Sequence, residues 1–192
     1  MNAESPRSSH DARAPSPWIV RHAALIAPGA RLLDLACGSG RHARFFAQRG
    51  VQVVAVDRDR EALAALADVA RIETRRIDLE GAAWPFAHER FDAIVVTNYL
   101  HRPALPLLVA SLADDGALLY ETFARGNEAY GRPWNPDFLL EPGELLTVVS
   151  DRLIVVEFAQ GLVDNAGRPA VVERLAAVGR ERRWPPPLPS AQ

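Results

Sequence analysis

The chain has 192 residues, enough for one domain with a sizeable core, and its formal net charge of -2 gives no broad attraction to nucleic acid or to anionic membranes. Its composition, 48% hydrophobic and 24% charged, is ordinary for a soluble globular protein. All 22 basic residues are arginines, which excludes chemistry that depends on a lysine amine.

The sequence also bears on location and on metal binding. No apolar run reaches the length that spans a membrane, and the N-terminus lacks the apolar core of a signal peptide, so we expect a cytoplasmic protein. The single cysteine, Cys37, forms no intramolecular disulfide and no cysteine metal cluster, so we expect no metal site.

The chain begins with a segment that carries no periodic pattern. Residues 1–16 are rich in Ser, Pro, Arg and Ala, which predicts a disordered arm. A helix is expected over residues 17–26, because Ser16 can cap its first turn and Pro17 suits the first helical position.

The next stretch predicts a strand, a tight turn, a helix and a second strand. An apolar run at 32–35 is followed by a glycine turn at 36–40, by an amphipathic helical pattern at 41–49 and by a valine-rich run at 51–56 that stops at Asp57. This is a βαβ unit whose first turn is a nucleotide-binding loop.

The glycine loop alone does not identify the nucleotide. Gly38, Gly40 and Ala43 satisfy the G-x-G-x-x-A form of the dinucleotide fingerprint, and Asp57 is placed to bind ribose hydroxyls. Asp34, at the end of the first strand, would repel a pyrophosphate and attract a ligand that carries an ammonium and a sulfonium. S-adenosylmethionine is such a ligand, so we expect it as the cofactor.

Strands and helices alternate up to residue 123, and the pattern then changes. Further strands are predicted at 72–79, 91–97, 117–123, 153–158 and 171–177, and helices at 59–70, 103–113 and 142–150. Residues 124–137 form a long connection rich in Gly, Pro, Asn and aromatics, of a kind that often serves as a lid. A short turn separates the last two strands, which are therefore expected to be antiparallel to each other.

Residues 33–40, LDLACGSG, closely resemble the first motif of class I S-adenosylmethionine-dependent methyltransferases. The resemblance covers residues 17–178 and implies an α/β fold: a Rossmann-like, doubly wound sheet of seven strands, mostly parallel with an antiparallel last strand, with helices on both faces. Residues 179–192 then form a Pro-rich flexible tail. Within the superfamily the chain is similar to the small single-domain enzymes of the tellurite-resistance and thiol type.

The resemblance also implies which residues bind the cofactor. Asp34 and the turn that follows it would hold the methionyl end of the cofactor. Asp57 would hold the ribose hydroxyls, and the residues after the third strand, Asp78 and Leu79, would contact the adenine. The full set is Asp34, Ala36, Cys37, Gly38, Ser39, Gly40, Asp57, Arg58, Asp78, Leu79, Asn98 and Tyr99.

Candidate catalytic residues follow the fourth and fifth strands, because ligands bind at the carboxyl ends of strands in open α/β sheets. They are Tyr99, His101 and Glu121: histidine is a frequent general base, and a carboxylate at a strand end could bind a cation or accept a proton. A packed histidine, or a carboxylate bonded to a loop amide, would need no such role. The substrate candidates in the long connection are Tyr130, Arg132 and Asn135, of which the arginine could clamp an anion.

The expected acceptor is a small molecule. The fourth strand ends in Thr97-Asn98-Tyr99-Leu100 rather than in the Asn-Pro-Pro-Tyr signature of enzymes that methylate adenine or glutamine amides, and the arginines are too scattered for a phosphate track. Nucleic acid is therefore disfavoured, and we expect no membrane partner and a monomer or homodimer. Three other readings stay open: a non-catalytic cofactor-binding module, an NAD-dependent oxidoreductase with the same glycine loop, and a tRNA or protein acceptor with a partner subunit.

Overall fold

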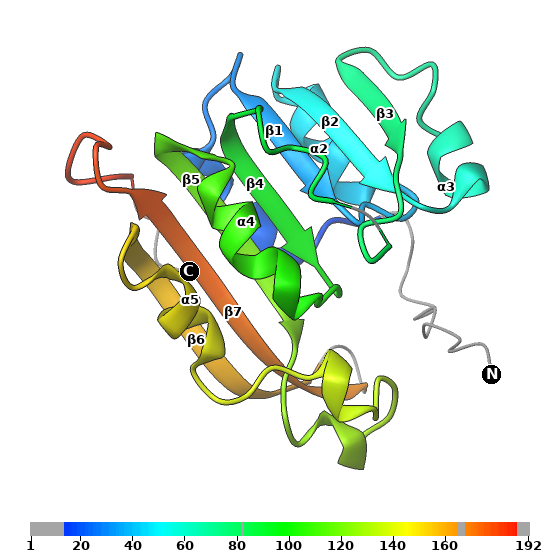
Figure 1. Ribbon diagram of the computed structural model, residues 1–192, viewed down its shortest axis with the longest axis vertical. Coiled ribbons are helices and arrows are strands. Elements are labelled where there is room, and N and C mark those ends of the chain that lie inside the picture. The colour runs from blue at the N-terminus through cyan, green and yellow to red at the C-terminus, as the bar shows by residue number, and fades with distance from the viewer. Residues whose placement is uncertain (1–13, 82, 165–167, 188–192) are drawn as a thin grey trace.

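The computed structural model describes residues 14–81, 83–164 and 168–187, which contain one sheet of seven strands in the order β3-β2-β1-β4-β5-β7-β6 (Figure 1). The strands are β1 (Arg31–Leu35), β2 (Gln52–Asp57), β3 (Ile72–Arg76), β4 (Phe91–Thr97), β5 (Leu112–Phe123), β6 (Leu153–Asp164) and β7 (Pro169–Gly179). The first five pair in parallel, and β7 is antiparallel to β5 and to β6. The predicted Rossmann-like α/β sheet with an antiparallel last strand is confirmed.

Helices flank the sheet on both faces. They are α1 (Pro17–Arg21), α2 (Arg41–Gln48), α3 (Arg60–Ala64), α4 (Leu105–Ala110) and α5 (Glu144–Val149), with single 3₁₀ turns η1 (Ala23–Leu25), η2 (Arg102–Ala104), η3 (Asn127–Ala129) and η4 (Pro136–Phe138). The helices α4 and α5 pack on one face, whereas α1, α2 and α3 pack on the other.

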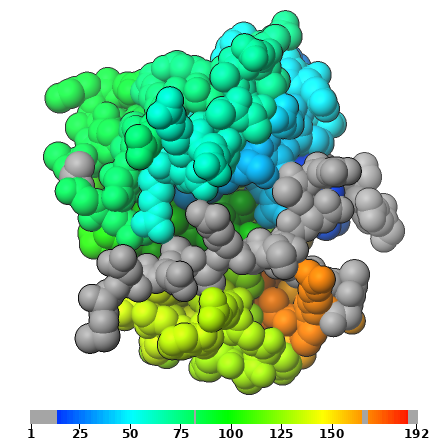
Figure 2. Space-filling model, turned by 90° about the vertical axis from the view of Figure 1, so that its right-hand side faces the viewer, coloured from blue at the N-terminus to red at the C-terminus, as the bar shows by residue number. Residues whose placement is uncertain are grey.

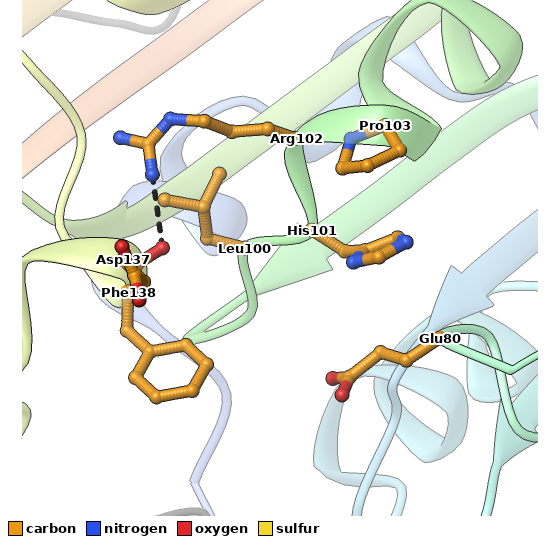
Figure 3. Close-up of a pocket in the computed structure, with 7 residues that line it drawn as sticks. All are labelled: Glu80, Leu100, His101, Arg102, Pro103, Asp137 and Phe138. Atoms are coloured by element: carbon orange, nitrogen blue, oxygen red, sulfur yellow. Dashed lines mark hydrogen bonds between the residues drawn. The ribbon is translucent and has the colours of Figure 1, made fainter.

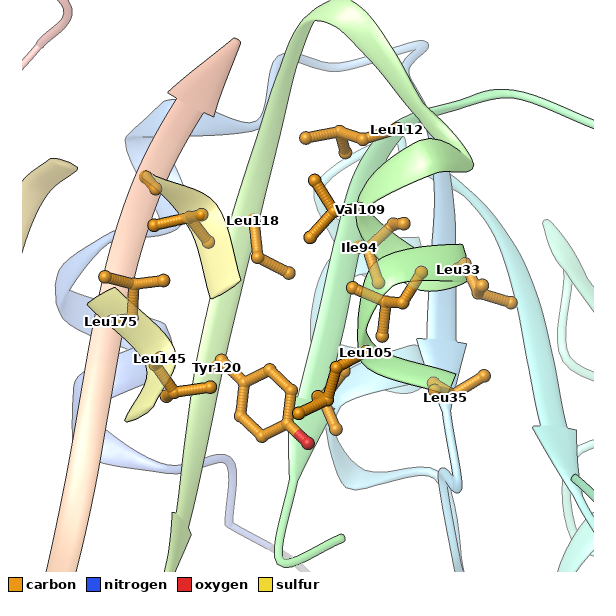
Figure 4. Packing of buried hydrophobic residues seen from close by; sticks show 14 of the residues in the cluster. Leu33, Leu35, Ile94, Leu105, Val109, Leu112, Leu118, Tyr120, Leu145 and Leu175 are labelled. Atoms are coloured by element: carbon orange, nitrogen blue, oxygen red, sulfur yellow. The ribbon is translucent and has the colours of Figure 1, made fainter. Parts of the chain in front are cut away.

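Strand residues alternate between two hydrophobic cores, because successive side chains of a strand point to opposite faces. On β1, Leu33 contributes to the core under α4 and α5, and Leu32 contributes to the core under α1 and α2. Figure 4 shows the first of these cores, in which Leu105 of α4 and Leu145 of α5 reach the sheet around Tyr120. Burial on both faces explains why the parallel strands are nearly continuous apolar runs.

Several predicted boundaries are wrong. The helix expected at 59–70 ends at Ala64, because the residues beyond it form short turns with i to i−3 hydrogen bonds that return the chain to β3. The helix expected at 103–113 ends at Ala110, since β5 begins already at Leu112, which pairs with Phe91 of β4. The strand expected at 72–79 ends at Arg76.

The two ends of the domain also differ in detail from the prediction. Ser16 caps α1 as expected, because its Oγ accepts a hydrogen bond from the backbone N–H of Trp18 over 3.2 Å. The helix stops at Arg21, however, and a 3₁₀ turn continues in place of the predicted ten-residue helix. The last two strands are antiparallel as predicted but longer, and they form a broad two-stranded extension of the sheet.

Parts of three predictions lie outside the described residues: positions 1–13 of the arm, 188–192 of the tail, and most of the turn before β7. Inside the described ranges Ser16 is buried, and Arg182 donates a hydrogen bond to the carbonyl oxygen of Leu25 over 2.7 Å. None of the helices in these ranges has the length and apolar character needed to cross a membrane.

Candidate functional site at the carboxyl edge of the sheet

The loop between β1 and α2 folds into a tight left-handed turn. Ala36, Gly38 and Gly40 have φ values of 53°, 54° and 76°, a region that glycine adopts without a side-chain clash. A Cβ atom on Gly40 would lie 2.4 Å from Cδ1 of Leu66 and would force that side chain to shift, so this position of positive φ favours glycine. The backbone N–H of Gly38 donates to Oδ2 of Asp57 over 2.8 Å, which ties the loop to the end of β2.

Asp34 is a buried carboxyl group just before this loop. Its side chain is 1% exposed, and Oδ2 has no hydrogen-bond partner among the described residues. Burial raises its pKa from 3.8 to about 7, opposed by a hydrogen bond from the backbone of Ala43 and by the charge of Arg41. Because an unpaired buried carboxylate is costly, the site fits a ligand that brings a positively charged hydrogen-bond donor. The ammonium group of the predicted cofactor is such a donor.

The residues predicted for ribose and adenine follow β2 and β3. Asp57 is half-buried, and its Oδ1 accepts a hydrogen bond from the backbone N–H of Asp59 over 2.9 Å. Arg58 and Asp78 are exposed, whereas Leu79 packs half-buried against the core. Since β1, β2 and β3 are parallel neighbours, these residues lie at the same sheet edge as the glycine loop.

The segment after β4 brings Asn98 and Tyr99 to this edge. Asn98 has a φ of 55°, uncommon for a residue with a side chain, and its N–H donates to the carbonyl oxygen of Glu121 over 2.9 Å. The Tyr99 hydroxyl is buried with no partner in the described part of the chain, and burial, followed by the charges of Glu80 and Asp78, raises its pKa. Tyr99 therefore lies on the side of the acids that follow β3.

Glu121, near the end of β5, is the centre of a buried polar cluster. Its Oε1 accepts a hydrogen bond from Oγ of Ser16 over 2.8 Å, and its Oε2 lies 2.6 Å from Nε of Arg174 on β7. The second contact is an ion pair without hydrogen-bond geometry, since neither atom has a hydrogen-bond partner in the described residues. Both carboxylate oxygens of Glu121 are therefore engaged.

His42 belongs to the same cluster, and the sequence analysis missed it. Its buried ring accepts a hydrogen bond at Nε2 from the backbone N–H of Ser16 over 3.0 Å, and Nδ1 lies 3.4 Å from Oγ1 of Thr97. Burial, reinforced by the charge of Arg41, lowers its pKa to about 3, so the ring is neutral. The one available signal was its place in the first turn of α2, directly behind the glycine loop.

His101 lies in a pocket of about 240 Å³ between the segment after β4 and the long connection (Figure 3). The lining residues are Glu80, Leu100, His101, Arg102, Pro103, Asp137 and Phe138. In Figure 3, His101 and Glu80 lie on one side of the pocket, and Asp137 and Phe138 lie on the other. The predicted candidates Tyr99 and Glu121 do not line this pocket.

The wall of this pocket is fixed by Arg102. Its Nε and one Nη donate to the two carboxylate oxygens of Glu144 over 2.8 and 2.9 Å. The guanidinium also donates to the carbonyl oxygens of Asp137 and Leu139 over 2.9 and 2.6 Å. Two of these hydrogen bonds hold the end of the long connection and Leu139 against the segment after β4, and the other two hold the start of α5 there.

The substrate candidates of the long connection lie apart from this pocket. Tyr130 and Arg132 are exposed, and Oδ1 of Asn135 accepts a hydrogen bond from the backbone of Asp137 as the cap of η4. None of the three lines the pocket at His101. In the space-filling view the connection, in yellow-green, lies across from the cyan segments around β2 and α3 (Figure 2).

Asn127 anchors the long connection and was not predicted. Its side chain is 2% exposed, Nδ2 donates to the carbonyl oxygen of Pro133 over 3.0 Å, and Oδ1 accepts from the backbone N–H of Val171 over 3.1 Å. The connection is therefore tied to β7 through one buried carboxamide.

Comparisons with known proteins agree with the fold. Residues 32–114 match a family model described as a methyltransferase domain. TehB from Haemophilus influenzae superposes with a TM-score of 0.69 at 22% identity, over 84% of this chain and 61% of that chain. A TehB-like SAM-dependent methyltransferase from Corynebacterium glutamicum superposes with a TM-score of 0.61 at 20% identity, over 84% of this chain and 86% of that chain. The N-methyltransferase NodS from Bradyrhizobium japonicum, in complex with S-adenosyl-L-homocysteine, superposes with a TM-score of 0.58 at 21% sequence identity, over 78% of each chain.

At these identities the structural likeness bears on the fold alone, and the chain spans 61% of the length of the Haemophilus protein. The family model adds a sequence match over the part that carries the glycine loop, from β1 into β5. The predicted resemblance to class I methyltransferases is therefore confirmed.

Proposed function

We propose that the chain is a class I S-adenosylmethionine-dependent methyltransferase and that it transfers a methyl group from S-adenosylmethionine to a small-molecule acceptor. The observation that carries the proposal is the buried Asp34 carboxyl, whose Oδ2 is left without a partner in the described residues. An ammonium placed there would relieve the cost of burying the charge, whereas a pyrophosphate would add a second negative charge.

The proposed cofactor site runs along the ends of the first three strands. Asp34 and the backbone of residues 36–40 would hold the amino-acid end, Asp57 the ribose hydroxyls, and Asp78 with its neighbours the adenine. The bound cofactor supplies a methyl group on a sulfonium, which is already activated for displacement. The task of this chain is then to align an acceptor with that methyl in a dry, fixed geometry.

The acceptor side is proposed at the ends of β4 and β5, where Thr97 and Glu121 are register partners. Ser16 lies over them, hydrogen-bonded to His42 and to Glu121. An acceptor has to reach this position past the segment that holds Ser16, which favours a small molecule over a folded protein or a nucleic acid. The formal net charge of -2 supports the same choice.

The predicted catalytic residues differ in their freedom to act as a base. Both carboxylate oxygens of Glu121 are engaged, so we assign it a positioning role toward Ser16 and Arg174. The ring of His101 lines a pocket and has no hydrogen bond or ion pair with any residue the structure describes. Because this pocket does not include Thr97 or Glu121, we propose His101 as general base only for an acceptor that extends into the pocket and must lose a proton.

Calorimetric titration with S-adenosylhomocysteine tests the cofactor half of the proposal. Asp34→Asn should weaken binding about tenfold or more, because a charge-assisted hydrogen bond is lost. Asp68→Asn, which changes an exposed carboxylate in the turn after α3, is the matched control. Equal affinity of Asp34→Asn and wild type would contradict the placement of the amino-acid end.

Labelled cofactor tests the acceptor half. The protein is incubated with ¹³C-methyl S-adenosylmethionine and a cell extract separated into small-molecule, protein and RNA fractions, and label is located by mass spectrometry. The proposal predicts label in a small molecule. Label confined to protein or RNA would contradict a small acceptor, and bound cofactor without any transfer would favour a non-catalytic binding module. Binding of NAD in place of S-adenosylhomocysteine would favour the oxidoreductase reading.

A further inference from the structure

The pocket at His101 has a lining whose charges indicate the kind of group that it binds. We infer that this pocket is a specificity subsite for a cationic group of the methyl acceptor, carried on an apolar segment. The inference rests on the proposed function, because it concerns the acceptor of the same reaction. The cation is the group that the pocket recognises, and it is distinct from the atom that receives the methyl.

The pocket lies next to the proposed acceptor position. Leu100 and His101 line it, and they follow β4 directly after Asn98 and Tyr99. Its volume of about 240 Å³ is below the range of about 300–1,000 Å³ that is usual for pockets enclosing a whole ligand. The pocket therefore fits one end of an acceptor whose other end extends toward Thr97.

Two of the lining side chains are carboxylates from different parts of the chain. Glu80 follows β3 and Asp137 belongs to η4, and they lie on opposite sides of the pocket (Figure 3). The backbone N–H of Glu80 donates to Oδ1 of Asp78 over 3.1 Å, and that of Asp137 donates to Oδ1 of Asn135 over 3.0 Å. Neither carboxylate forms a hydrogen bond or an ion pair within the described part of the chain. Both are therefore available to a cation that enters between them.

Arg102, the arginine of the lining, is already neutralised. Four of its five N–H groups donate hydrogen bonds, two of them to the carboxylate of Glu144 and two to carbonyl oxygens. The hydrogen bonds to Glu144 raise the pKa of Arg102, and the charge of Asp137 adds to this effect. Glu80, Asp137 and Glu144 together outnumber the single guanidinium, so the pocket attracts cations and repels anions.

The lining favours an organic cation over a metal ion. The described residues include no group of three or more His, Cys, Asp or Glu side chains that could hold a metal ion. Leu100, Pro103 and Phe138 give the pocket apolar surface between its two carboxylates. An ammonium group on a short alkyl or aromatic segment would place its charge near the carboxylates and pack its carbon atoms on this surface.

The test uses three probes that share a benzene ring and differ in charge. Benzylamine is a cation at neutral pH, benzyl alcohol is neutral and benzoate is an anion. Each is titrated by NMR into the full chain saturated with S-adenosylhomocysteine, and the signals of His101 and Phe138 report binding in the pocket. The variants are Glu80→Gln, Asp137→Asn and the two together. The matched control is Glu181→Gln, which changes an exposed carboxylate just past β7, at the opposite edge of the sheet.

The subsite predicts that benzylamine binds most tightly and benzoate most weakly. Each single variant should weaken benzylamine about 2- to 5-fold, as expected for the loss of one solvent-accessible ion pair, and the double variant should weaken it further. The affinity for benzyl alcohol should change little, and Glu181→Gln should resemble the wild type. Ligand-free melting verifies that each variant is folded.

Three results would overturn the inference while leaving the proposed function intact. They are benzoate binding at His101 and Phe138 as tightly as benzylamine, a benzylamine affinity that the double variant leaves unchanged, and no response of these two residues to any probe. A wild-type protein that does not bind S-adenosylhomocysteine would instead contradict the proposed function itself, and the subsite with it.

Discussion

The backbone N–H of Ser16 donates a hydrogen bond to Nε2 of His42 over 3.0 Å, and this contact fixes the position of the ring proton. Since a backbone N–H can only donate, Nε2 accepts, and the proton of the neutral ring is on Nδ1. Nδ1 lies 3.4 Å from Oγ1 of Thr97 and donates to it, which leaves the hydroxyl proton of Thr97 free for another acceptor. His42 thus orients the hydroxyl of Thr97. It also holds Ser16, whose segment covers Thr97.

Asp34 and His42 oppose each other in the pH dependence of stability. Folding raises the pKa of Asp34 from 3.8 to about 7, so its contribution to stability is present at low pH and is lost as the pH rises through that window. Folding lowers the pKa of His42 from 6.5 to about 3, so its contribution is present above pH 6.5 and is lost as the pH falls. Between about pH 4.5 and 6 the two effects nearly cancel.

Replacing either residue removes one side of this balance. Relative to wild type, the free energy of unfolding of Asp34→Asn should rise with pH by about 1.4 kcal/mol per pH unit, and that of His42→Gln should fall by a similar amount. Urea unfolding at several pH values across this window measures both slopes. If the free energy of unfolding of both variants changed with pH as that of the wild type does, folding would shift neither of the two pKa values.

Cofactor affinity should depend on the ionisation of Asp34. The carboxyl group titrates near pH 7 in the folded protein, and only its charged form pairs fully with an ammonium. Affinity for S-adenosylhomocysteine is therefore expected to rise up to about pH 7 and then to level off. Asp34→Asn should bind weakly at every pH. A flat wild-type profile in calorimetric titrations would argue against Asp34 as the partner of the ammonium.

The ion pair between Glu121 and Arg174 should carry a measurable coupling energy. The two residues are register partners on β5 and β7, and both side chains are largely buried. Glu121→Ala should destabilise the protein by about 3–5 kcal/mol, because it leaves a buried guanidinium unpaired. Adding Arg174→Met should cost less than the sum of the single changes. Strict additivity in urea unfolding would mean that the pair contributes nothing.

Asn127 should control the order of the long connection. Asn127→Ala removes both hydrogen bonds of its carboxamide and leaves the N–H of Val171 without its acceptor, at a cost of about 1–3 kcal/mol. Hydrogen exchange should accelerate in residues 124–137 and stay unchanged in β4. Asn135→Ala, which removes only the cap of η4, is the control with a smaller local effect. Equal exchange in wild type and Asn127→Ala would exclude the anchoring role.

The predicted cofactor residues from Asp34 to Asp57 share one contiguous stretch, and Asp78, Leu79, Asn98 and Tyr99 were predicted from the ends of later strands. Asp34, the glycine loop and Asp57 are separated by one strand, one turn and one helix, so their spacing alone predicts a common sheet edge. The strand pattern likewise predicted the parallel sheet and the antiparallel end. Helix ends were missed because the residues after Ala64 keep a helical composition while the chain turns toward β3.

The rest of the site joins distant parts of the chain, where local spacing carries no information. The contact between Ser16 and His42 spans 26 positions and joins the residue before α1 to the first turn of α2. Glu80 and Asp137 line one pocket although one follows β3 and the other lies in η4, so no local pattern predicts that they are neighbours.

The most direct measurement is thermal unfolding of the full chain with S-adenosylhomocysteine, with NAD and without ligand. A ligand at about one hundred times its dissociation constant adds about 2.7 kcal/mol to the stability of the folded state. S-adenosylhomocysteine should therefore raise the melting temperature clearly, and NAD should leave it unchanged. Stabilisation by NAD but not by S-adenosylhomocysteine would contradict the assignment of Asp34 to an ammonium, and with it the proposed methyl transfer.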